Sequence, residues 1–321
     1  MRIVVTGATG LLGKFLIASL RKYGHEIVGL YRSEIPADKS IEWFKTGLLE
    51  SENLVEVFSG ADVVIHAAAL VSFNGSDDDK LYETNVIGTR NVVNACLASG
   101  VGKLIHVSSV AALGKYQDSI IVDESAPWTG GTSGYGRSKY QAELEVFRAA
   151  EEGLRVSIIN PSVILAPGDL TRSTGRIFKY ILDGNLFYAL GTGGFVDVRD
   201  VVRVVELLLD YNQSGERFIL NGFSMTWKDF MQTLARGLGV RPPKFAIPRN
   251  AMMVVAGLEK MRSWILGTEP LITPTSIRLS SEVNDYKTLK ISQLLNFKFT
   301  SQEDTLNWLS SQLSDSRNPV G

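Results

Sequence analysis

Short apolar segments rich in valine and isoleucine alternate with longer segments of helical periodicity through the first half of the chain. A short, continuously apolar segment is typical of a strand buried on both faces, and apolar positions that recur every three or four residues are typical of a helix with one buried face. The predicted strands cover residues 2–6, 26–30, 62–66, 103–108 and 155–160, and the predicted helices cover residues 11–23, 79–99 and 135–152. This alternation predicts a parallel sheet covered by helices on both faces.

The pattern changes after Pro161, where proline and glycine residues divide the chain into shorter pieces. Residues 195–198 and 217–220 are apolar enough to return to the sheet as late strands, with a helix from about residue 200 to 211 between them. The last part of the chain is mostly helical in pattern, and Ser301–Asp304 is typical of the start of its final helix.

These elements predict an α/β fold, a doubly wound parallel sheet with a smaller, mostly helical C-terminal cap. The predicted α/β domain covers residues 1–165 with 195–222 returning to it, and the predicted cap covers residues 166–194 and 223–321. The most apolar segment of the cap, Ala251 to Leu266, contains three charged residues and therefore predicts an amphipathic helix, not a membrane anchor.

The composition of the chain argues against several kinds of binding partner. The net charge of −1 offers no electrostatic basis for binding nucleic acid or an anionic membrane. No apolar run approaches the ~20 residues of a membrane span, and the first strand leaves no room for a signal peptide. The single cysteine, Cys96, excludes an internal disulfide and favours a reducing, cytoplasmic location. The separated histidines His25, His66 and His106 form no metal-ligand cluster, so no metal is expected.

Three glycines, Gly7, Gly10 and Gly13, lie at i, i+3 and i+6 between the first predicted strand and the first predicted helix. Glycine has no Cβ, so the backbone can turn sharply and pass close to a ligand. The free N–H groups and positive dipole end of the following helix suit a pyrophosphate. The motif predicts a dinucleotide-binding βαβ unit, although a tight turn without a ligand would leave the same pattern.

Tyr135 and Lys139 stand four residues apart at the start of a predicted helix, which places them on one face. An ammonium close to a phenol lowers the phenol's pKa from about 10 and makes it a usable proton donor nearer neutral pH. Ser109 follows a predicted strand at its carboxyl end, where open parallel sheets bind ligands. Taken singly, a surface tyrosine and lysine, or a serine that ends a strand, remain open alternatives.

Together these residues resemble the extended short-chain dehydrogenase/reductase family, also called the NAD-dependent epimerase/dehydratase family, over nearly the whole chain. The matching segments are Thr6–Gly13, Asp62–Ala69, Glu83–Thr89 around Asn85, Ser109, Tyr135, Lys139 and Asn160–Val163. The resemblance implies a Rossmann-type fold whose cap binds the substrate. It also implies cofactor contacts from Gly7, Thr9, Gly10, Leu11, Leu12, Gly13, Arg32, Leu48, Ala67, Ala68, Ala69, Lys139, Pro161 and Val163.

The resemblance further implies the roles of a Ser-Tyr-Lys triad. Tyr135 would act as general acid toward a carbonyl or as base toward an alcohol, while hydride moves to or from the nicotinamide. Lys139 would lower the pKa of Tyr135 and bind the ribose hydroxyls, and Ser109 would position the substrate oxygen. Asn85 is left outside the catalytic set, because it could equally tie its helix to a neighbouring strand.

The end of the second predicted strand bears on the choice between NADP and NAD. The strand ends without an acidic residue, and Arg32 is available to pair with a 2′-phosphate, with Ser33 beside it. We therefore expect NADP, with NAD open if Arg32 only stacks on the adenine. The segment Gly47–Glu50 departs from the Gly-Asp-Leu that the family often has, so the aspartate that meets adenine is absent and Leu48 is left to contribute through its backbone.

The reaction most in keeping with the resemblance is that of the dihydroflavonol reductase and 3β-hydroxysteroid dehydrogenase branch, namely NADPH-dependent reduction of a ketone or aldehyde, or the reverse oxidation. Asn160 replaces the arginine of that branch's Arg-Pro-Ser motif. The residues expected to face an apolar substrate are Val71, Phe73, Trp128, Phe187 and Tyr188, in a cleft formed largely by residues 169–194 and 249–274.

Two alternatives stay open. One is a nucleotide-sugar epimerase with tightly bound NAD, although the family's Arg-Tyr-Phe-Asn is replaced by Ile158–Pro161. The other is an NADP-binding sensor without catalysis, which the presence of Tyr135, Lys139 and Ser109 disfavours. The partner is expected to be a small molecule, and a homodimer through the helices near residues 80–99 and 135–152 is possible from the resemblance alone.

Overall fold

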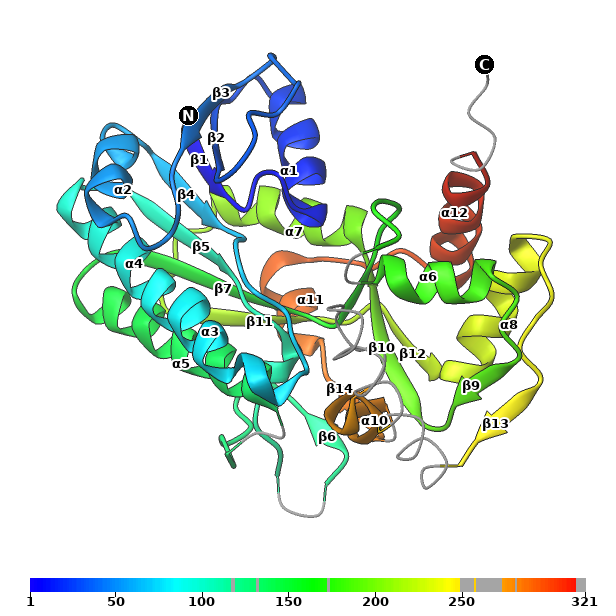
Figure 1. Ribbon diagram of the computed structural model, residues 1–321. Helices are drawn as coiled ribbons and strands as arrows, with labels where there is room; N and C mark the ends of the chain where they lie inside the picture. Colours follow the sequence, from blue (N-terminus) through cyan, green and yellow to red (C-terminus); the bar gives the residue numbers. More distant parts are fainter. Residues whose placement is uncertain are drawn as a thin grey trace.

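The computed structural model describes residues 1–116, 119–130, 133–171, 174–248, 257, 273–280 and 282–315. A seven-stranded parallel sheet has the order β11-β7-β5-β4-β1-β2-β3 (Figure 1). The strands are β1 (Arg2–Thr6), β2 (Glu26–Tyr31), β3 (Glu42–Lys45), β4 (Val63–His66), β5 (Lys103–Val107), β7 (Arg155–Pro161) and β11 (Glu216–Leu220). The order of connection reverses between β1 and β4, which opens a crevice at their carboxyl ends.

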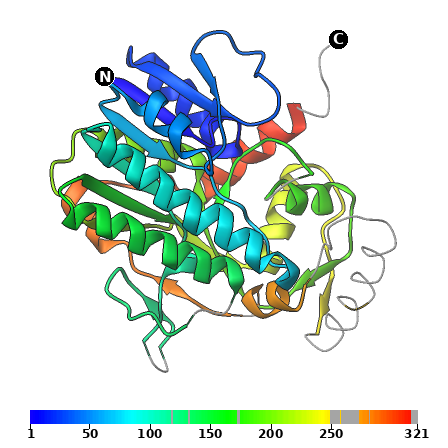
Figure 2. The same cartoon turned by 60° about the vertical axis from the view of Figure 1, so that its left-hand side comes forward.

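Helices cover both faces of the sheet, which confirms the predicted doubly wound α/β fold. One face carries α1 (Leu11–Lys22), α7 (Val198–Leu209) and α11 (Leu289–Leu295), and the other carries α2 (Ser51–Phe58), α4 (Gly88–Ala98) and α5 (Gly134–Glu151). Successive residues of a strand point to opposite faces, so Val5 packs under α1 and α7 whereas Val4 packs under α2 and α4. The helices α4 and α5 lie side by side in Figure 2.

The predicted helix over residues 79–99 is divided in the structure. It consists of α3 (Asp78–Leu81), a π-helical segment (Tyr82–Ile87) and α4, preceded by a 3₁₀ turn at Gly75–Asp77. The sequence analysis did not predict β3 and α2. They are short, and β3 is a half-buried edge strand, so neither gives enough turns of a periodic pattern to be recognised.

A second group of elements forms the cap beside the sheet (Figure 1). Its strands are β8 (Val163–Leu165), β9 (Phe187–Ala189), β10 (Thr192–Asp197), β12 (Phe223–Thr226) and β13 (Phe245–Ile247), and its helices are α6 (Gly175–Leu182), α8 (Trp227–Gly237), α10 (Pro274–Ser280) and α12 (Gln302–Asp315). A parallel pair, β6 (Ile121–Val122) with β14 (Asp285–Tyr286), joins a loop after β5 to the C-terminal part. The start of α12 is as predicted, since Ser301 Oγ accepts from the Asp304 amide at 3.1 Å.

One strand prediction is wrong. Residues 217–220 do return to the sheet as part of β11, but residues 195–198 do not, because β10 pairs with β8 and β12 in a separate three-stranded sheet. The physical reason is the ring of Phe195, which stacks on Phe223 and Phe230 at centroid distances of 5.7 and 4.5 Å inside the cap core. The predicted helix at Ala251 to Leu266 lies outside the described residues, apart from Gly257.

Candidate functional site

The glycine turn after β1 is closely packed against the chain that follows β4. Gly7 has a φ of 69°, and a Cβ there would lie 2.7 Å from the backbone nitrogen of Ala68. A Cβ on Gly13 would lie 2.2 Å from the carbonyl oxygen of Gly7. The amide of Gly10 donates to the Gly7 carbonyl at 2.9 Å and so closes the turn. The absence of side chains at Gly7 and Gly13 is therefore required by the fold itself.

The N-terminus of α1 has the properties of an anion site. Its N-cap is Gly10, no side chain caps it, and no acidic residue stands in its first turn. Thr9 and Gly10 are exposed, whereas Leu12 is buried in the sheet core, so Leu12 is placed to meet a ligand through its backbone. Unpaired N–H groups at the positive end of a helix suit a phosphate group. The turn thus fits the pyrophosphate of a dinucleotide.

The residues expected near the adenosine lie at the ends of β2 and β3. Arg32 and Ser33 are exposed just after β2, and no hydrogen bond or ion pair joins Arg32 to another described residue. The carbonyl of Leu48 accepts from Asn91 Nδ2 at 3.0 Å, which ties this loop to α4. Glu50 turns back on its own loop and accepts from the Gly47 amide at 3.2 Å, so its carboxylate does not replace the missing aspartate.

Asn85 ties the π-helical segment to the chain after β4. Its Oδ1 accepts from the Leu70 amide at 2.7 Å, and its Nδ2 donates to the Leu70 carbonyl at 2.9 Å and to Ser138 Oγ at 3.0 Å. Asn85 therefore has a structural tie, but it joins its helix to a loop and to α5, not to a neighbouring strand as expected. The tie holds the alanine segment in place, with Ala67 and Ala68 half-buried beside the glycine turn and Ala69 exposed.

Ser109, Tyr135 and Lys139 come together at the carboxyl end of β5. The Ser109 Oγ accepts from the Ala111 amide at 3.2 Å, and Ser109 lies near enough to Tyr135 to influence its pKa. Tyr135 is 9% exposed, and Phe73 meets its ring edge-on at a centroid distance of 5.8 Å. Burial raises the pKa of Tyr135, and Ser109 acts in the opposite direction.

The expected effect of Lys139 on Tyr135 stays a prediction, because in this arrangement burial and Ser109 are the influences on the pKa of Tyr135. The Lys139 ammonium, fully buried, donates to the Val107 carbonyl at 2.9 Å and lies 3.5 Å from His106 Nε2. Burial lowers the pKa of Lys139 to about 8, and the charge of Glu143 raises it. In this arrangement the Lys139 ammonium donates its hydrogen bond to the backbone of β5, and no hydrogen bond joins it to the Tyr135 hydroxyl.

The sequence analysis missed a layer of buried polar side chains beneath this site. Thr6, His66 and His106 stand in register on β1, β4 and β5. His66 bonds through Nδ1 to the Thr6 hydroxyl at 2.7 Å and through Nε2 to the Thr89 hydroxyl at 2.9 Å, and its ring lies 5.1 Å from that of His106. The available signal was a polar residue at or near the end of each of these otherwise apolar strands.

The end of β7 completes the layer. Asn160 Nδ2 donates to the Ser109 carbonyl at 3.0 Å and to Glu143 Oε1 at 2.6 Å. Pro161 is buried at the end of β7, and Val163 is half-buried at the start of β8. The bond from Asn160 holds the end of β7, just before Pro161, against the loop that carries Ser109.

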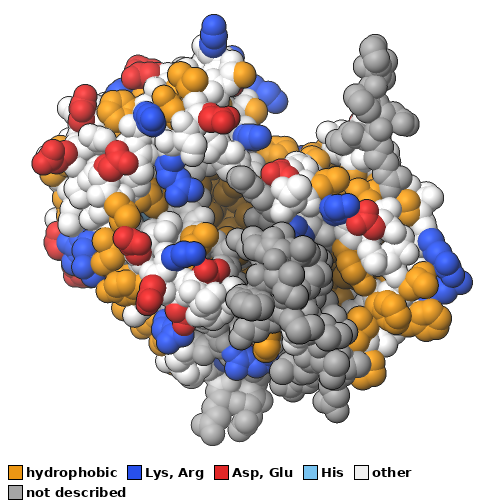
Figure 3. Space-filling model, viewed as in Figure 1, with side chains coloured by type: hydrophobic (Ala, Val, Ile, Leu, Met, Phe, Trp, Pro, Cys, Tyr) orange, Lys and Arg blue, Asp and Glu red, His pale blue; other side chains and the backbone are white. Residues whose placement is uncertain are grey.

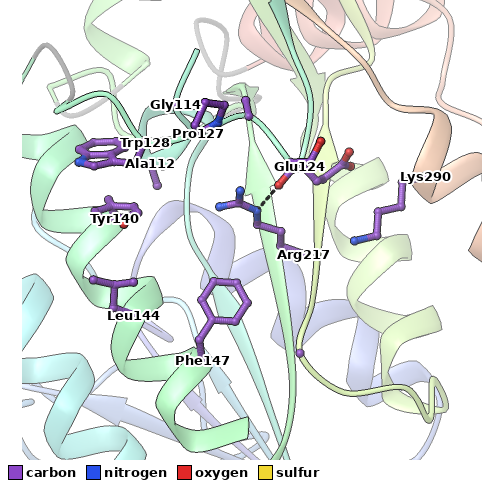
Figure 4. Close-up of a pocket in the computed structure, with 13 residues that line it drawn as sticks. Ala112, Gly114, Glu124, Pro127, Trp128, Tyr140, Leu144, Phe147, Arg217 and Lys290 are labelled. Atoms are coloured by element: carbon purple, nitrogen blue, oxygen red, sulfur yellow. Dashed lines mark hydrogen bonds between the residues drawn. The ribbon is translucent and has the colours of Figure 1, made fainter. Parts of the chain in front are cut away.

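Among the described residues that were expected to face the substrate, Phe73 is the one whose ring packs on the ring of Tyr135. Trp128 stacks on Tyr140 at 4.2 Å and lines a separate pocket of about 480 Å³ between α5 and β11 (Figure 4). Phe187 packs on Phe245 at 6.0 Å in the two-stranded sheet of the cap. Each of these two rings has an aromatic neighbour, and their expected contact with substrate stays a prediction. Val71 is 49% exposed and Tyr188 is half-buried.

The surface is hollowed between the sheet and the cap, with hydrophobic side chains at the bottom of the hollow (Figure 3). Most of the expected cleft segment at residues 249–274 lies outside the described residues. Within the described ranges, no helix is long and apolar enough to cross a membrane, and no group of three or more His, Cys, Asp or Glu side chains is arranged to hold a metal ion.

Comparison with known proteins gives consistent matches. The model of the NAD dependent epimerase/dehydratase family matches residues 3–221. Sterol demethylase protein B of Methylococcus capsulatus is 32% identical over 81% of this chain and 81% of the relative. The 3beta-hydroxysteroid-dehydrogenase/decarboxylase isoform 1 of Arabidopsis thaliana is 28% identical over 92% of this chain and 75% of the relative. The crystal structure of gox2253 superposes with a TM-score of 0.82 at 28% identity, over 98% of each chain.

Proposed function

The chain belongs to the NAD-dependent epimerase/dehydratase family of NAD(P)-dependent oxidoreductases, and we propose that it reduces a ketone or aldehyde with NADPH, or oxidises the corresponding secondary alcohol. The observation that carries the proposal is the convergence of Ser109, Tyr135 and Lys139 at the carboxyl end of β5. The neighbouring strand is β4, and the chain that follows β4 packs on the glycine turn, so the triad and the turn lie at the same edge of the sheet. The cofactor, when bound, supplies or accepts the hydride.

Each residue of the triad has a task that its surroundings support. Tyr135 is protonated at neutral pH and stands at the carboxyl end of β5, so it is placed to donate that proton to a carbonyl oxygen. Burial alone makes it a weaker acid, so the transfer needs a positive charge close to the phenol. Ser109 is placed to position the same oxygen, since it lies beside Tyr135 at the carboxyl end of β5. Lys139 contributes a positive charge that favours the phenolate once the proton has left, provided that its ammonium turns from the Val107 carbonyl.

The proposal is tested with Tyr135→Phe. We expect turnover on a panel of ketones and aldehydes to fall about 100-fold or more, because the general acid is lost, while NADPH affinity measured by fluorescence stays within twofold. Tyr140→Phe is the matched control, because this hydroxyl belongs to the same helix but its ring stacks on Trp128 in the separate pocket. Unchanged turnover in the Tyr135 variant would refute the mechanism, and a parent protein that reduces no carbonyl would refute the function.

The NADP preference is proposed from Arg32, whose guanidinium is exposed at the end of β2 without a described partner. Arg32→Ala should weaken NADPH binding about 10-fold or more, because a charge-assisted pair with the 2′-phosphate is lost, and should change NADH binding little. Arg241→Ala, an exposed arginine in the cap, serves as the control for the loss of one positive charge. Equal weakening of both nucleotides would contradict the proposed contact and indicate stacking on adenine.

A further inference from the structure

A buried carboxylate lies one helical turn beyond Lys139. Glu143 is 0% exposed, its Oε1 accepts from Asn160 Nδ2 at 2.6 Å, and its Oε2 pairs with Arg217 Nη1 at 3.2 Å. A buried charge costs several kcal/mol unless it is paired and hydrogen-bonded, and here both oxygens have a partner. Two side chains of the sheet, Asn160 on β7 and Arg217 on β11, thus bind the carboxylate of Glu143 on α5.

Arg217 reaches Glu143 from the edge strand of the sheet. Its Nε donates to the Glu124 carbonyl at 2.7 Å, which holds one side of the guanidinium while the other side faces α5 (Figure 4). The side chain of Arg217 is 16% exposed at this position. Because the guanidinium is held at both sides, the counter-charge of Glu143 has a defined place.

The three residues Tyr135, Lys139 and Glu143 follow one another at intervals of four, so they share one face of α5. The other titratable groups around Lys139 are His106 on β5 and His66 on β4, and both are held neutral, since burial and the lysine charge lower their pKa values. Glu143 is therefore the negative charge that faces Lys139 among the described groups. Without it, burial alone would act on the ammonium.

We propose that Glu143 is a positioning residue, which Arg217 and Asn160 hold in place so that its charge keeps Lys139 protonated at the carboxyl end of β5. This deepens the proposed function and rests on it, because a neutral amine could not favour the phenolate of Tyr135. The device is electrostatic, so Glu143 acts through Lys139 and is not expected to touch substrate.

The experiment follows the titration of Lys139 directly, in the purified full chain labelled with ¹³C at the lysine Cε positions. The Lys139 signal is assigned by its absence from the spectrum of Lys139→Met. In the parent protein we expect a midpoint near pH 8. In Glu143→Gln the midpoint should fall by about one pH unit or more, because an opposite charge has been removed.

Glu145→Gln is the matched control. It makes the same chemical change on the same helix, but Glu145 faces Arg90 and Arg148 on the outer side, at 2.9 and 3.0 Å. Its Lys139 midpoint should stay where the parent's is. A second variant, Arg217→Gln, alters a residue nearer the surface. It should raise the midpoint, because the cation that neutralises the charge of Glu143 has been removed. If Glu143→Gln does not fold, the Lys139 midpoint in Arg217→Gln tests the role of Glu143 instead.

The outcomes separate this inference from the proposed function. If the midpoint moves in Glu143→Gln and the alkaline limb of kcat/KM moves to lower pH by the same amount, both are supported. If the midpoint moves but the parent protein reduces no carbonyl, the positioning role stands and the proposed function fails. A Lys139 midpoint that is unchanged in Glu143→Gln, or in Arg217→Gln when only that variant folds, overturns the inference.

Discussion

At the scale of single residues, His66 shows how the fold settles a protonation state. The Thr6 hydroxyl and the Thr89 hydroxyl occupy its two ring nitrogens, and Thr89 itself donates to the Asn85 carbonyl at 2.6 Å, so it accepts from His66. The neutral ring is thus satisfied on both sides. Burial, with the charge of Lys139, lowers the pKa of His66 to about 3.

This shift predicts a loss of stability in acid. Unfolded His66 binds a proton below about pH 6.5, whereas the folded chain binds one only near pH 3, so falling pH favours unfolding between these values. His66→Gln should reduce the pH dependence of the unfolding free energy by about 1.4 kcal/mol per pH unit well below pH 6.5. The measurement is urea unfolding from pH 8 to pH 4, and the difference at pH 8 gives the packing cost separately. An equal slope in parent and variant would contradict the assignment.

The triad shows what spacing could and could not predict at this scale. The interval of four placed Tyr135 and Lys139 on one face, as the structure confirms. It could not give the direction in which the pKa of Tyr135 moves, because that depends on burial of the ring beside Phe73. Glu143 has the same spacing from Lys139 and was overlooked, because its counter-ion lies 74 residues away in the chain.

At the scale of elements, the turn between β1 and α1 depends on two glycines for different reasons. Gly7 needs a positive φ, whereas Gly13 lies inside α1 with ordinary helical geometry and is needed only because Gly7 and Ala8 pack against it. A helical glycine replaced by alanine normally gains about 1 kcal/mol. Here the added Cβ would meet rigid backbone atoms, so the sign is reversed.

Gly13→Ala should therefore destabilise the chain by about 2 kcal/mol, because the cost of overpacking exceeds the gain in helix propensity. Thermal unfolding measures the stability, and NADPH titration should show weaker binding, because the turn is displaced. Gly75→Ala is the control, since a Cβ at that position meets no atom within 4 Å. Parent-like stability and nucleotide affinity in Gly13→Ala would disprove the packing argument.

Several elements could not be predicted from local pattern alone. The π-helical segment Tyr82–Ile87 includes Asn85, whose hydrogen bonds reach Leu70 and Ser138 in other elements. The strand β10 has the apolar composition of a sheet strand, and only the rings that surround Phe195 direct it into the cap. In both cases the deciding contacts are made with residues distant in sequence.

At the scale of the whole molecule, α12 joins the cap to the sheet. Trp308 packs against both cores, with the Arg199 guanidinium 4.0 Å from its ring and the Phe15 ring 6.4 Å away. The hollow of Figure 3 lies between the two parts. A ligand at the end of β5 would lie along this boundary, where loops from both parts can contact it.

The proposed reductase and the alternative epimerase differ in how long the whole molecule retains its cofactor. An epimerase must keep the cofactor through a cycle that regenerates it, whereas a reductase exchanges it every turnover. We expect mass spectrometry of the freshly purified, denatured protein to find no stoichiometric nucleotide, and the empty protein to bind NADPH more tightly than NADH. Stoichiometric NAD or NADH would instead favour the epimerase. The parent protein denatured after incubation with NADPH provides the positive control.

The sequence by itself determined the alternation of most strands and helices along the chain, the glycine turn after β1 and the shared face of Tyr135 and Lys139. Hydrophobic periodicity and residue spacing are local properties of the chain, so they can be recognised without the fold. The tertiary structure alone decided that β10 belongs to the cap, that Trp128 lines the pocket between α5 and β11, and that the Lys139 ammonium bonds to Val107 beside His106. Those outcomes depend on burial and on charges, and both arise only when strands distant in sequence pack side by side.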